Sequence, residues 1–437
     1  MGLLGIKPGR MKRALIITYY WPPSGGSGVQ RWVKFSKYLP SLGWQPVVYT
    51  PLNPELSSTD PSLAAEIPPE AEVIKRRILE PYGIYNALSG KKTSGLNPIN
   101  SQDRSLRHRI FLWIRANFFV PDPRIAWLRP SVRFLRKYLR EHPVDVIVST
   151  GPPQSMHLIA REVSKATGLP WIADFRDPWT KMFYYKDLPL TRRNDRRQHL
   201  LEKRVLDDAT VVVAVSPIVQ EEFEAMTDTP VTLITNGFDE SDFEGEVTGS
   251  EDFTVTHTGL FSSVGNPETL WKVLAEKCAN ESEFARKLKI RLAGKTDREI
   301  KESIEAAGLG EKVVDLGYVP HKEAVKEQRA ASMLILPLRK EPEYRAVLPG
   351  KLFEYLASGR PILGIGQKDG AMARLVRENE AGCVADWEDE REIKEYIGYC
   401  WESFIAGKKA RGAADVEKYS RRALSGAMAA LMDSLVK

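Results

Sequence analysis

A glycine-rich loop near the amino terminus has the residue types of an anion site. It is formed by Gly25, Gly26, Ser27 and Gly28. The loop follows a short apolar run and precedes a helical pattern, so its backbone N–H groups can approach an anion at the start of a helix. An NAD site is not expected, because Arg31 stands where a dinucleotide fingerprint needs its third glycine and no acidic residue follows at 49–51. A tight turn that binds nothing is the alternative.

A second group of polar residues opens a predicted helix in the carboxyl-terminal half. Pro349 and Gly350 mark a turn, and the helical pattern runs to a glycine stop at Gly359. Lys351 and the free N–H groups of the first turn would meet a diphosphate. Glu354 lies one turn further and can accept two hydrogen bonds from a ribose diol. The alternative is a glutamate that only complements the helix dipole.

Alternating strands and helices must position these residues. Short apolar runs are separated by stretches of helical periodicity, which is typical of a mostly parallel sheet with helices on both faces. The pattern begins again after an acidic, Gly- and Ser-bearing segment at 240–252. We therefore predict an α/β fold of two doubly wound, Rossmann-like domains that face a cleft, with ligands at the carboxyl ends of the strands.

The same pattern sets the expected domain limits. The first domain covers 1–245 and is interrupted by a long insertion at 52–125; the second covers 246–410. A helical segment at 411–437 follows and is expected to pack back on the first domain.

The net charge of +6 conceals a local excess. Residues 101–140 hold ten basic and two acidic residues, a net charge of +8, which leaves −2 for the rest. A nucleic-acid-binding protein usually spreads its positive charge more widely, so we predict no nucleic-acid partner. The segment 104–119 interleaves Arg107, Arg109 and Arg115 with aromatic and aliphatic residues. Such a helix suits the inner membrane surface, with its anionic lipids; a buried helix with solvated arginines is the alternative.

Composition narrows the class of protein. With 43% hydrophobic and 27% charged residues, the 437-residue chain is typical of soluble globular proteins, and it has no apolar run of about 18 residues that would span a membrane. Its three cysteines form no C-x-x-C pair, so we expect neither a disulfide framework nor a structural zinc. We predict a cytoplasmic, reducing compartment and, without an Asp-x-Asp triplet or a His/Cys cluster, a metal-free mechanism.

An ordered set of motifs resembles the retaining glycosyltransferases of family four, which have the two-domain GT-B fold. The likeness covers nearly the whole chain from about Lys12 and is greatest to bacterial enzymes that build surface polysaccharides. The motifs are Tyr20-Trp21-Pro22-Pro23 with the glycine loop, Ser149-Thr150-Gly151-Pro152-Pro153, Asp174-Phe175-Arg176-Asp177-Pro178-Trp179, Thr235-Asn236-Gly237-Phe238-Asp239, Gly317-Tyr318-Val319-Pro320-His321 and the run from Lys351 to Pro361.

The resemblance implies a hexosyl-type glycosyltransferase without cofactor or metal. It would move a sugar from a nucleotide-diphosphate sugar, with a UDP-sugar favoured, to a surface-glycan or polyprenyl-linked acceptor, retaining configuration. The first domain would be the acceptor side and the second would bind the donor. Glu354 would hold the donor ribose and Gly350 with Lys351 its phosphates, while Tyr318 and Val319 would flank the base. The glycine loop would face the diphosphate and the acceptor.

Two departures from the family pattern concern the donor. The family often has a second glutamate eight residues before the ribose glutamate, where this chain has Ala346. It also often has an arginine and a lysine after the first strand of the second domain, but the segment 259–271 holds no basic residue. We therefore expect Arg345, Lys351 and Arg339 to neutralise the phosphates.

Asp177 and Arg176 are the candidate catalytic residues, at the position where the family keeps a residue that touches the donor sugar. Alternation sends their side chains to opposite sides, so one of the two should face the site. We prefer Asp177, which can accept from a sugar hydroxyl or stabilise a developing oxocarbenium charge; an aspartate that caps the segment before Pro178 is the alternative. His157, at the start of a predicted helix, is a further candidate to face the cleft.

Two other functions remain open. A nucleotide-sugar epimerase of the same architecture would convert its donor without an acceptor. A non-catalytic partner subunit would keep the fold and bind no donor, and the missing carboxylate at Ala346 keeps that reading open.

Overall fold

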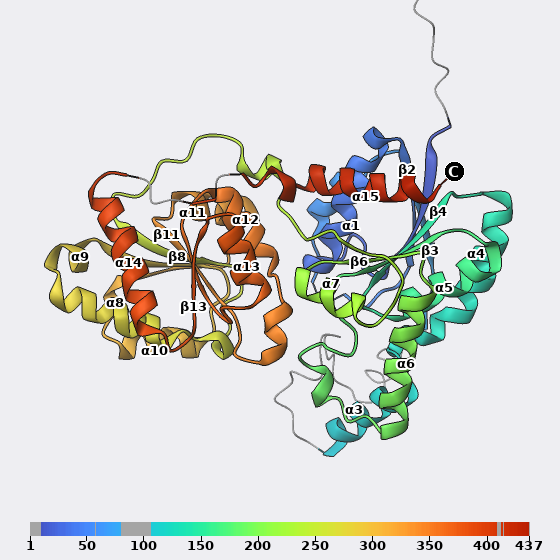
Figure 1. Ribbon diagram of the computed structural model, residues 1–437, viewed down its shortest axis with the longest axis horizontal. Coiled ribbons are helices and arrows are strands. Elements are labelled where there is room, and N and C mark those ends of the chain that lie inside the picture. The colour runs from blue at the N-terminus through green and yellow to red at the C-terminus, as the bar shows by residue number, and fades with distance from the viewer. Residues whose placement is uncertain (1–9, 57, 80–105, 409–411, 414, 437) are drawn as a thin grey trace, which may run out of the picture. The chain divides into compact units, whose positions relative to one another are not determined.

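The computed structural model describes residues 10–56, 58–79, 106–408, 412–413 and 415–436 (Figure 1). The chain divides into two compact units. One comprises Met1–Thr235 with Leu424–Lys437, and the other comprises Asn236–Ala423. Each unit has its own sheet and its own helices.

The first unit is built on a seven-stranded sheet whose neighbouring strands are all parallel, in the order β3-β2-β1-β4-β5-β6-β7. The strands are β1 (Lys12–Ile17), β2 (Trp44–Pro51), β3 (Glu72–Arg76), β4 (Val146–Gly151), β5 (Trp171–Phe175), β6 (Val211–Ala214) and β7 (Val231–Leu233). Strand order reverses between β1 and β4, which makes their carboxyl ends the topological switch point of a doubly wound sheet.

Hydrophobic burial explains these strands and the helices that cover them. The apolar runs 14–17 and 146–148 are fully buried, as expected for parallel strands covered on both faces. The helices of this unit are α1 (Ser27–Tyr38), α3 (Leu106–Phe118), α4 (Leu128–Glu141), α5 (Ser155–Thr167), α6 (Arg192–Asp208) and α7 (Pro217–Glu224). In α4, for example, Ser131, Leu135 and Leu139 recur every four residues and form its buried face.

The second unit repeats the design with six parallel strands in the order β10-β9-β8-β11-β12-β13. The strands are β8 (Phe253–Thr258), β9 (Leu288–Ala293), β10 (Val313–Gly317), β11 (Met333–Pro337), β12 (Ile362–Ile365) and β13 (Gly382–Ala385). The helices are α8 (Glu268–Asn280), α9 (Ser282–Lys287), α10 (Arg298–Ala306), α11 (His321–Ala330), α12 (Gly350–Ser358), α13 (Ala371–Glu378) and α14 (Glu390–Ile405). Helix α12 ends at Gly359 in the left-handed conformation, which confirms the predicted glycine stop.

Helix α15 (Arg421–Leu435) carries the chain back to the first unit. Its Met428 and Met432 are fully buried in the core of that unit, together with Phe35 and Trp44. Figure 1 shows α15 lying alongside α1. The last helical segment therefore completes the first unit, as the sequence predicted.

The predicted α/β class with two Rossmann-like domains is confirmed. The sequence interpretation missed β3, which lies inside the 52–125 insertion as the edge strand of the first sheet. Edge strands are often short and charged, and Glu72, Lys75 and Arg76 leave no apolar run to detect. Compactness does not fix functional domain limits, so the limits at 245 and 410 stay a prediction. No helix in the described part of the chain is long and apolar enough to cross a membrane.

Candidate functional site

Helix α12 starts at the carboxyl edge of the second sheet, where Lys351 reaches back to the end of β8. The Lys351 ammonium donates to the carbonyl oxygen of Thr258 at 2.7 Å and to that of Leu260 at 3.3 Å. It also lies 3.3 Å from Nε2 of His257. The first turn of α12 holds no acidic residue and its start has no side-chain cap. One cation and one helix N-terminus thus coincide, an arrangement that favours an anion.

Burial controls the protonation of Lys351 and His257 at the start of α12. It lowers the pKa of Lys351 to about 8, and the charge of Glu354 opposes the shift. His257 is buried and stacks on Phe261 with ring centroids 4.1 Å apart. Burial, aided by the Lys351 charge, holds the pKa of His257 well below its usual value. His257 is therefore neutral near pH 7, and its Nε2 can accept the Lys351 hydrogen bond.

Glu354 lies one turn into α12, and a buried amide orients its carboxylate. Gln328 on α11 donates from Nε2 to Glu354 Oε2 at 2.9 Å and to Thr258 Oγ1 at 3.0 Å. The second carboxylate oxygen, Oε1, lies 3.9 Å from His321 Nε2, and the Glu354 side chain is 23% exposed. A partly exposed carboxylate held from behind can accept two hydrogen bonds from a vicinal diol.

Three glycines lie at the same edge: Gly259 and Gly294 directly follow β8 and β9, and Gly317 is the last residue of β10. Gly259 and Gly317 have positive φ values of 84° and 59°. Gly294 donates from its N–H to the Gly317 carbonyl at 2.7 Å, and a Cβ on Gly294 would lie 2.3 Å from the Gly259 carbonyl oxygen. Side chains are thereby kept off the strand ends, so that a ligand can approach bare backbone.

The other predicted donor cations are paired with acids. Arg345 is exposed and donates to Asp369 at 2.7 Å. Arg339 donates to Glu341 at 2.5 Å. Since neither guanidinium lies in α12, Lys351 is the cation that the structure places at the start of this helix.

The other residues of the predicted donor site lie directly after β10 and around the start of α12. Tyr318 is 89% exposed and Val319 is half-buried, directly after β10. Gly350 is exposed, with open space where a Cβ would stand. Ala346, at the position of the missing glutamate, is half-buried on the turn before α12.

In the first unit, the glycine loop joins β1 to α1, and Ser27 is the first residue of that helix. Gly25 donates from its N–H to the Ser58 carbonyl at 2.9 Å, and Gly26 has a positive φ of 92°. A Cβ on Gly28 would lie 3.2 Å from the Arg176 guanidinium. The loop is therefore fixed by its neighbours on both sides.

Arg176 acts on this loop through backbone contacts. Its guanidinium donates to the carbonyl oxygens of Gly28 and Pro152, and its Nε donates to that of Gly151 at 3.3 Å. The residue is only 9% exposed. Arg176 therefore links the glycine loop to the end of β4 and the loop after it, and so positions the glycine loop.

Two aspartates at the end of β5 have opposite environments. Asp174 is fully buried, receives hydrogen bonds from Arg31 at 2.9 Å and Trp32 at 2.7 Å, and has its pKa lowered by these partners against the effect of burial. Asp177 is half-buried, and burial raises its pKa to about 6, although the Arg176 charge opposes the shift. Asp174 is thus held in an ion pair, whereas the raised pKa of Asp177 makes it a candidate for a functional role.

Helix α6 holds the loop that contains Asp177. Glu202, itself buried, accepts from the N–H of Trp179 at 3.1 Å and from the hydroxyl of Thr180 at 2.5 Å. Gln198 accepts from the Trp179 indole at 2.8 Å. The residues just after Asp177 are thus anchored from behind.

His157 is enclosed instead of facing open space. It is fully buried and stacks on Phe175, and burial lowers its pKa to about 3. Trp171 donates to Ser149 Oγ at 2.8 Å, so the Ser149 hydroxyl can donate to His157 Nδ1, also at 2.8 Å. His157 is therefore a neutral ring within the core of this unit.

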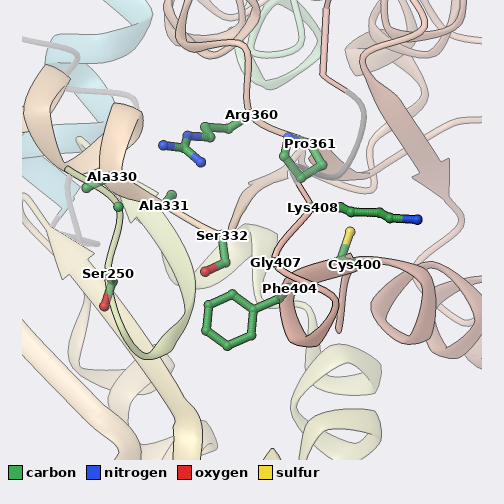
Figure 2. Close-up of a pocket in the computed structure, with 11 residues that line it drawn as sticks. Ser250, Ala330, Ala331, Ser332, Arg360, Pro361, Cys400, Phe404, Gly407 and Lys408 are labelled. Atoms are coloured by element: carbon green, nitrogen blue, oxygen red, sulfur yellow. The ribbon is translucent and has the colours of Figure 1, made fainter. Parts of the chain in front are cut away.

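A cavity of about 210 Å³ lies at the opposite, amino-terminal edge of the second sheet. Ser332 and Pro361, the residues before β11 and β12, line it together with Arg360, Cys400 and Lys408 (Figure 2). In Figure 2 the Arg360 and Lys408 side chains point away from each other. Because its two cations do not converge, we assign this cavity no ligand.

Comparison with known proteins gives these sites a context. Residues 96–242 match the family model Glycosyltransferase Family 4, and residues 253–403 match Glycosyl transferases group 1. The chain is a glycosyltransferase of the GT-B fold. The first matched range contains β5 and the loop of Asp177, and the second contains Lys351 and Glu354. No curated protein matches the chain in sequence.

Several solved glycosyltransferase structures share the fold at low sequence identity. Sucrose-phosphate synthase from Thermosynechococcus elongatus is 15% identical over 98% of both chains, with a TM-score of 0.59. Anabaena HepE, solved with UDP and glucose, is 16% identical over 97% of this chain and 100% of its own, with a TM-score of 0.58. The lipopolysaccharide outer core galactosyltransferase WaaB is 12% identical over 97% and 99%, with a TM-score of 0.59.

The sequence interpretation missed the residues that support Lys351 and Glu354. Thr258, His257 and Gln328 reach the α12 start from β8 and α11. Gln328 is 1% exposed, and a buried amide within a helix has no signature in a single sequence. The glycine after β9, Gly294, could have been noticed, since a glycine directly after an apolar run often marks a close backbone approach.

Proposed function

We propose that this glycosyltransferase moves a hexosyl group from a UDP-sugar to a hydroxyl of a surface-glycan or polyprenyl-linked acceptor. The observation that carries the proposal is the corner formed by Lys351, Glu354 and the bare strand ends at Gly259, Gly294 and Gly317. It offers a cation and a helix N-terminus for a diphosphate. It also offers an oriented carboxylate for a ribose diol.

Each part of the donor has a proposed partner. Lys351 and the backbone N–H groups in the first turn of α12, which begins at Gly350, bind the diphosphate. Glu354 accepts hydrogen bonds from the ribose hydroxyls. The exposed ring of Tyr318 and the backbone at Val319 flank the base. The solved structure of HepE with UDP and glucose supports the choice of a UDP-sugar, because HepE shares the fold along nearly the whole chain. Arg345 has a smaller role, as its guanidinium pairs with Asp369.

The proposed reaction exchanges one bond at the sugar carbon. The acceptor hydroxyl oxygen forms a bond to the anomeric carbon while the bond from that carbon to the diphosphate oxygen breaks. UDP leaves with the electron pair of the broken bond, and its leaving oxygen takes up the hydroxyl proton. The Lys351 ammonium and the α12 N-terminus stabilise the leaving charge without a metal. Asp177 stabilises the positive charge that develops on the sugar. Arg176 holds the Gly25–Gly28 loop, which serves the acceptor side of the reaction. Likeness to family four supports retention of configuration.

The acceptor and the location are part of the same proposal. The name of WaaB, a lipopolysaccharide galactosyltransferase of the same fold, supports a bacterial surface glycan. We place the enzyme in the cytoplasm, at the inner membrane face where a polyprenyl-linked acceptor would lie. The free thiols of Cys278, Cys383 and Cys400 fit a reducing compartment.

Calorimetric titration with UDP, GDP, ADP and NAD tests the donor site. We expect UDP to bind best and Glu354→Ala to weaken it by about 1.5–3 kcal/mol, roughly ten- to a hundredfold, because the ribose hydroxyls lose a charged acceptor. Glu323→Ala, which removes an exposed carboxylate from α11, is the matched control and should leave the affinity unchanged.

The same titration, together with assays for epimerised and transferred sugar, distinguishes the competing functions. If no nucleotide binds, the chain is a non-catalytic partner and the assigned roles of Lys351 and Glu354 are wrong. If UDP-sugar is converted to an epimer without any acceptor, the chain is an epimerase. Transfer of labelled sugar to a lipid or glycan extract, with loss in Glu354→Ala, would support the proposal.

A further inference from the structure

The outer face of α3 is an exposed apolar stripe. Five large hydrophobic residues recur at helical spacing along it, with these exposed fractions: Leu106 70%, Ile110 51%, Trp113 44%, Ile114 40% and Phe118 70%. Single exposed hydrophobic residues are normal, but five on one helix face form a patch that usually contacts something. Among them, the Trp113 and Phe118 rings lie 6.0 Å apart.

The opposite side of α3 attaches it to its own unit. Ala116 is buried, and Arg115 is half-buried with a charge that acts on Tyr184. Arg115 therefore faces inward, whereas the sequence interpretation grouped it with the basic outer face. Among the α3 side chains that the structure describes, which do not include those of Arg107 and His108, the apolar stripe and Arg109 are exposed.

The start of α6 lies next to this stripe and is strongly basic. Asn117 on α3 accepts from the N–H of Thr191 at 2.8 Å and donates to the Pro189 carbonyl at 2.8 Å, and Asn194 donates to the Asn117 carbonyl at 2.9 Å. Figure 1 shows α3 beside this end of α6. The first two turns of α6 then carry four exposed arginines: Arg192, Arg193, Arg196 and Arg197. Within the described ranges no ion pair engages these four side chains.

We infer that α3 and the first two turns of α6 form one docking surface for an anionic lipid bilayer. The aromatic and aliphatic side chains of α3 would enter the interface between headgroups and acyl chains, and the arginines of α6 would bind the lipid phosphates. Charge complementarity selects this occupant, because an apolar stripe bordered by four exposed arginines matches an anionic headgroup layer. The sequence placed a membrane contact on 104–119 alone; the structure adds the α6 arginines, about 80 residues further along the chain.

This surface extends the proposed function, but its test does not depend on donor binding. Flotation with vesicles of phosphatidylcholine, with and without about 30% phosphatidylglycerol, measures the affinity of the full chain. Binding should need the anionic lipid and should weaken when salt rises from about 50 mM to 500 mM. If the wild-type chain binds UDP but not the anionic vesicles, the docking surface is refuted and the donor site is unaffected.

Three variants locate the surface. Replacement of Arg192, Arg193, Arg196 and Arg197 by Ser should weaken binding to anionic vesicles on the order of a hundredfold. The triple variant Ile110→Ser, Trp113→Ser and Ile114→Ser should also weaken vesicle binding about a hundredfold, because it removes apolar contacts with the bilayer. The matched control replaces four exposed arginines of α4, Arg129, Arg133, Arg136 and Arg140, by Ser and should bind as wild type does. Circular dichroism and thermal unfolding of each variant verify that the chain is folded.

Trp113 provides a local readout. Brominated lipid should quench a part of the wild-type fluorescence that Trp113→Phe lacks. The inference is overturned if wild type fails to float, if the α4 variant loses binding equally, or if quenching is the same in both proteins. It is also overturned if the apolar variant converts a dimer to a monomer, since a second copy of the chain would then cover the stripe. Binding that appears only after deletion of 82–103 would show that the chain covers the stripe itself.

Discussion

The carboxyl edges of the two sheets carry their charged groups in opposite ways. In the first unit, the buried pair of Arg31 and Asp174 satisfies itself: Arg31 also donates to the carbonyl oxygens of Ile234 and Thr235 at 2.8 and 2.7 Å, and Thr150 donates to Asp174 at 2.9 Å. In the second unit, the Glu354 carboxylate has one oxygen held by Gln328 and remains partly exposed.

This difference separates rigidity from recognition. The buried ion pair of Arg31 and Asp174 holds α1, β4, β5 and the backbone at 234–235 in one arrangement. Because its hydrogen-bonding groups are already engaged, the pair offers nothing to a ligand. A carboxylate oriented by a neutral amide keeps its charge for a ligand. Asp177, three residues after Asp174, resembles the second case although it lies in the first unit, because its carboxylate is half-buried with a raised pKa.

Breaking the internal pair should have the largest effect. Asp174→Ala leaves the Arg31 charge buried without its counter-ion and should lower the free energy of unfolding of the first unit by about 3–5 kcal/mol. Hydrogen exchange of the β4 and β5 amides under increasing urea measures that loss. The double variant Arg31→Met with Asp174→Leu should recover most of the stability. A loss below about 1 kcal/mol in Asp174→Ala would show that the two edges do not differ in this way.

Asp177→Asn should raise the free energy of unfolding at neutral pH, in contrast to Asp174→Ala. Burial raises the pKa of Asp177 from its ordinary value to about 6, so the folded state favours the protonated form, and stability is lost as pH rises from about 4 through 6. At pH 7.5 the variant, whose amide carries no charge, should therefore be more stable than wild type by about 1–3 kcal/mol, and the gain should vanish at about pH 4. Urea unfolding at both pH values measures it. Sugar transfer should fall sharply in this variant and, in wild type, below about pH 6.

The smallest expected effect is a pH dependence of donor binding. Burial lowers the pKa of Lys351 to about 8, so its ammonium is present below that pH and is lost above it. UDP affinity should fall by up to about tenfold per pH unit above 8, and binding near pH 8.5 should take up protons. Titrations in buffers of different ionisation enthalpy measure that uptake. Lys351→Met should abolish the dependence, whereas Lys322→Met on α11 should keep it; an unchanged profile in Lys351→Met would assign the diphosphate to another cation.

The sequence predicted more of the fold than of the site's surroundings. Apolar runs such as 146–148 are readable because both faces of a parallel strand are buried, and the turn at Pro349 with the stop at Gly359 delimits α12. Glu354 and Lys351 could be proposed from their place in that helix. Gln328, which orients Glu354, lies 26 residues earlier on another helix, and only the packing of α11 against α12 shows the contact.

Arg176 illustrates a second limit. Strand alternation predicted that only one of Arg176 and Asp177 faces the site, and this stays a prediction; Arg176 is buried and Asp177 is half-buried. The identity of the partners of Arg176, three backbone carbonyls in two loops, depends on how the chain folds around Gly28 and Pro152. A single sequence shows that a guanidinium is present but not where its hydrogen bonds go. The catalytic roles of Asp177 and Arg176 stay predictions.

The central claim is that the second unit binds the donor and that Asp177 serves the transfer step. One measurement tests it most directly: calorimetric titration of UDP-glucose against Glu354→Ala and Asp177→Asn, side by side with wild type. The account predicts that Glu354→Ala loses roughly ten- to a hundredfold in affinity. It predicts that Asp177→Asn binds within about threefold of wild type while losing transfer. Equal affinity in Glu354→Ala and wild type, or a donor affinity lost only in Asp177→Asn, would contradict it.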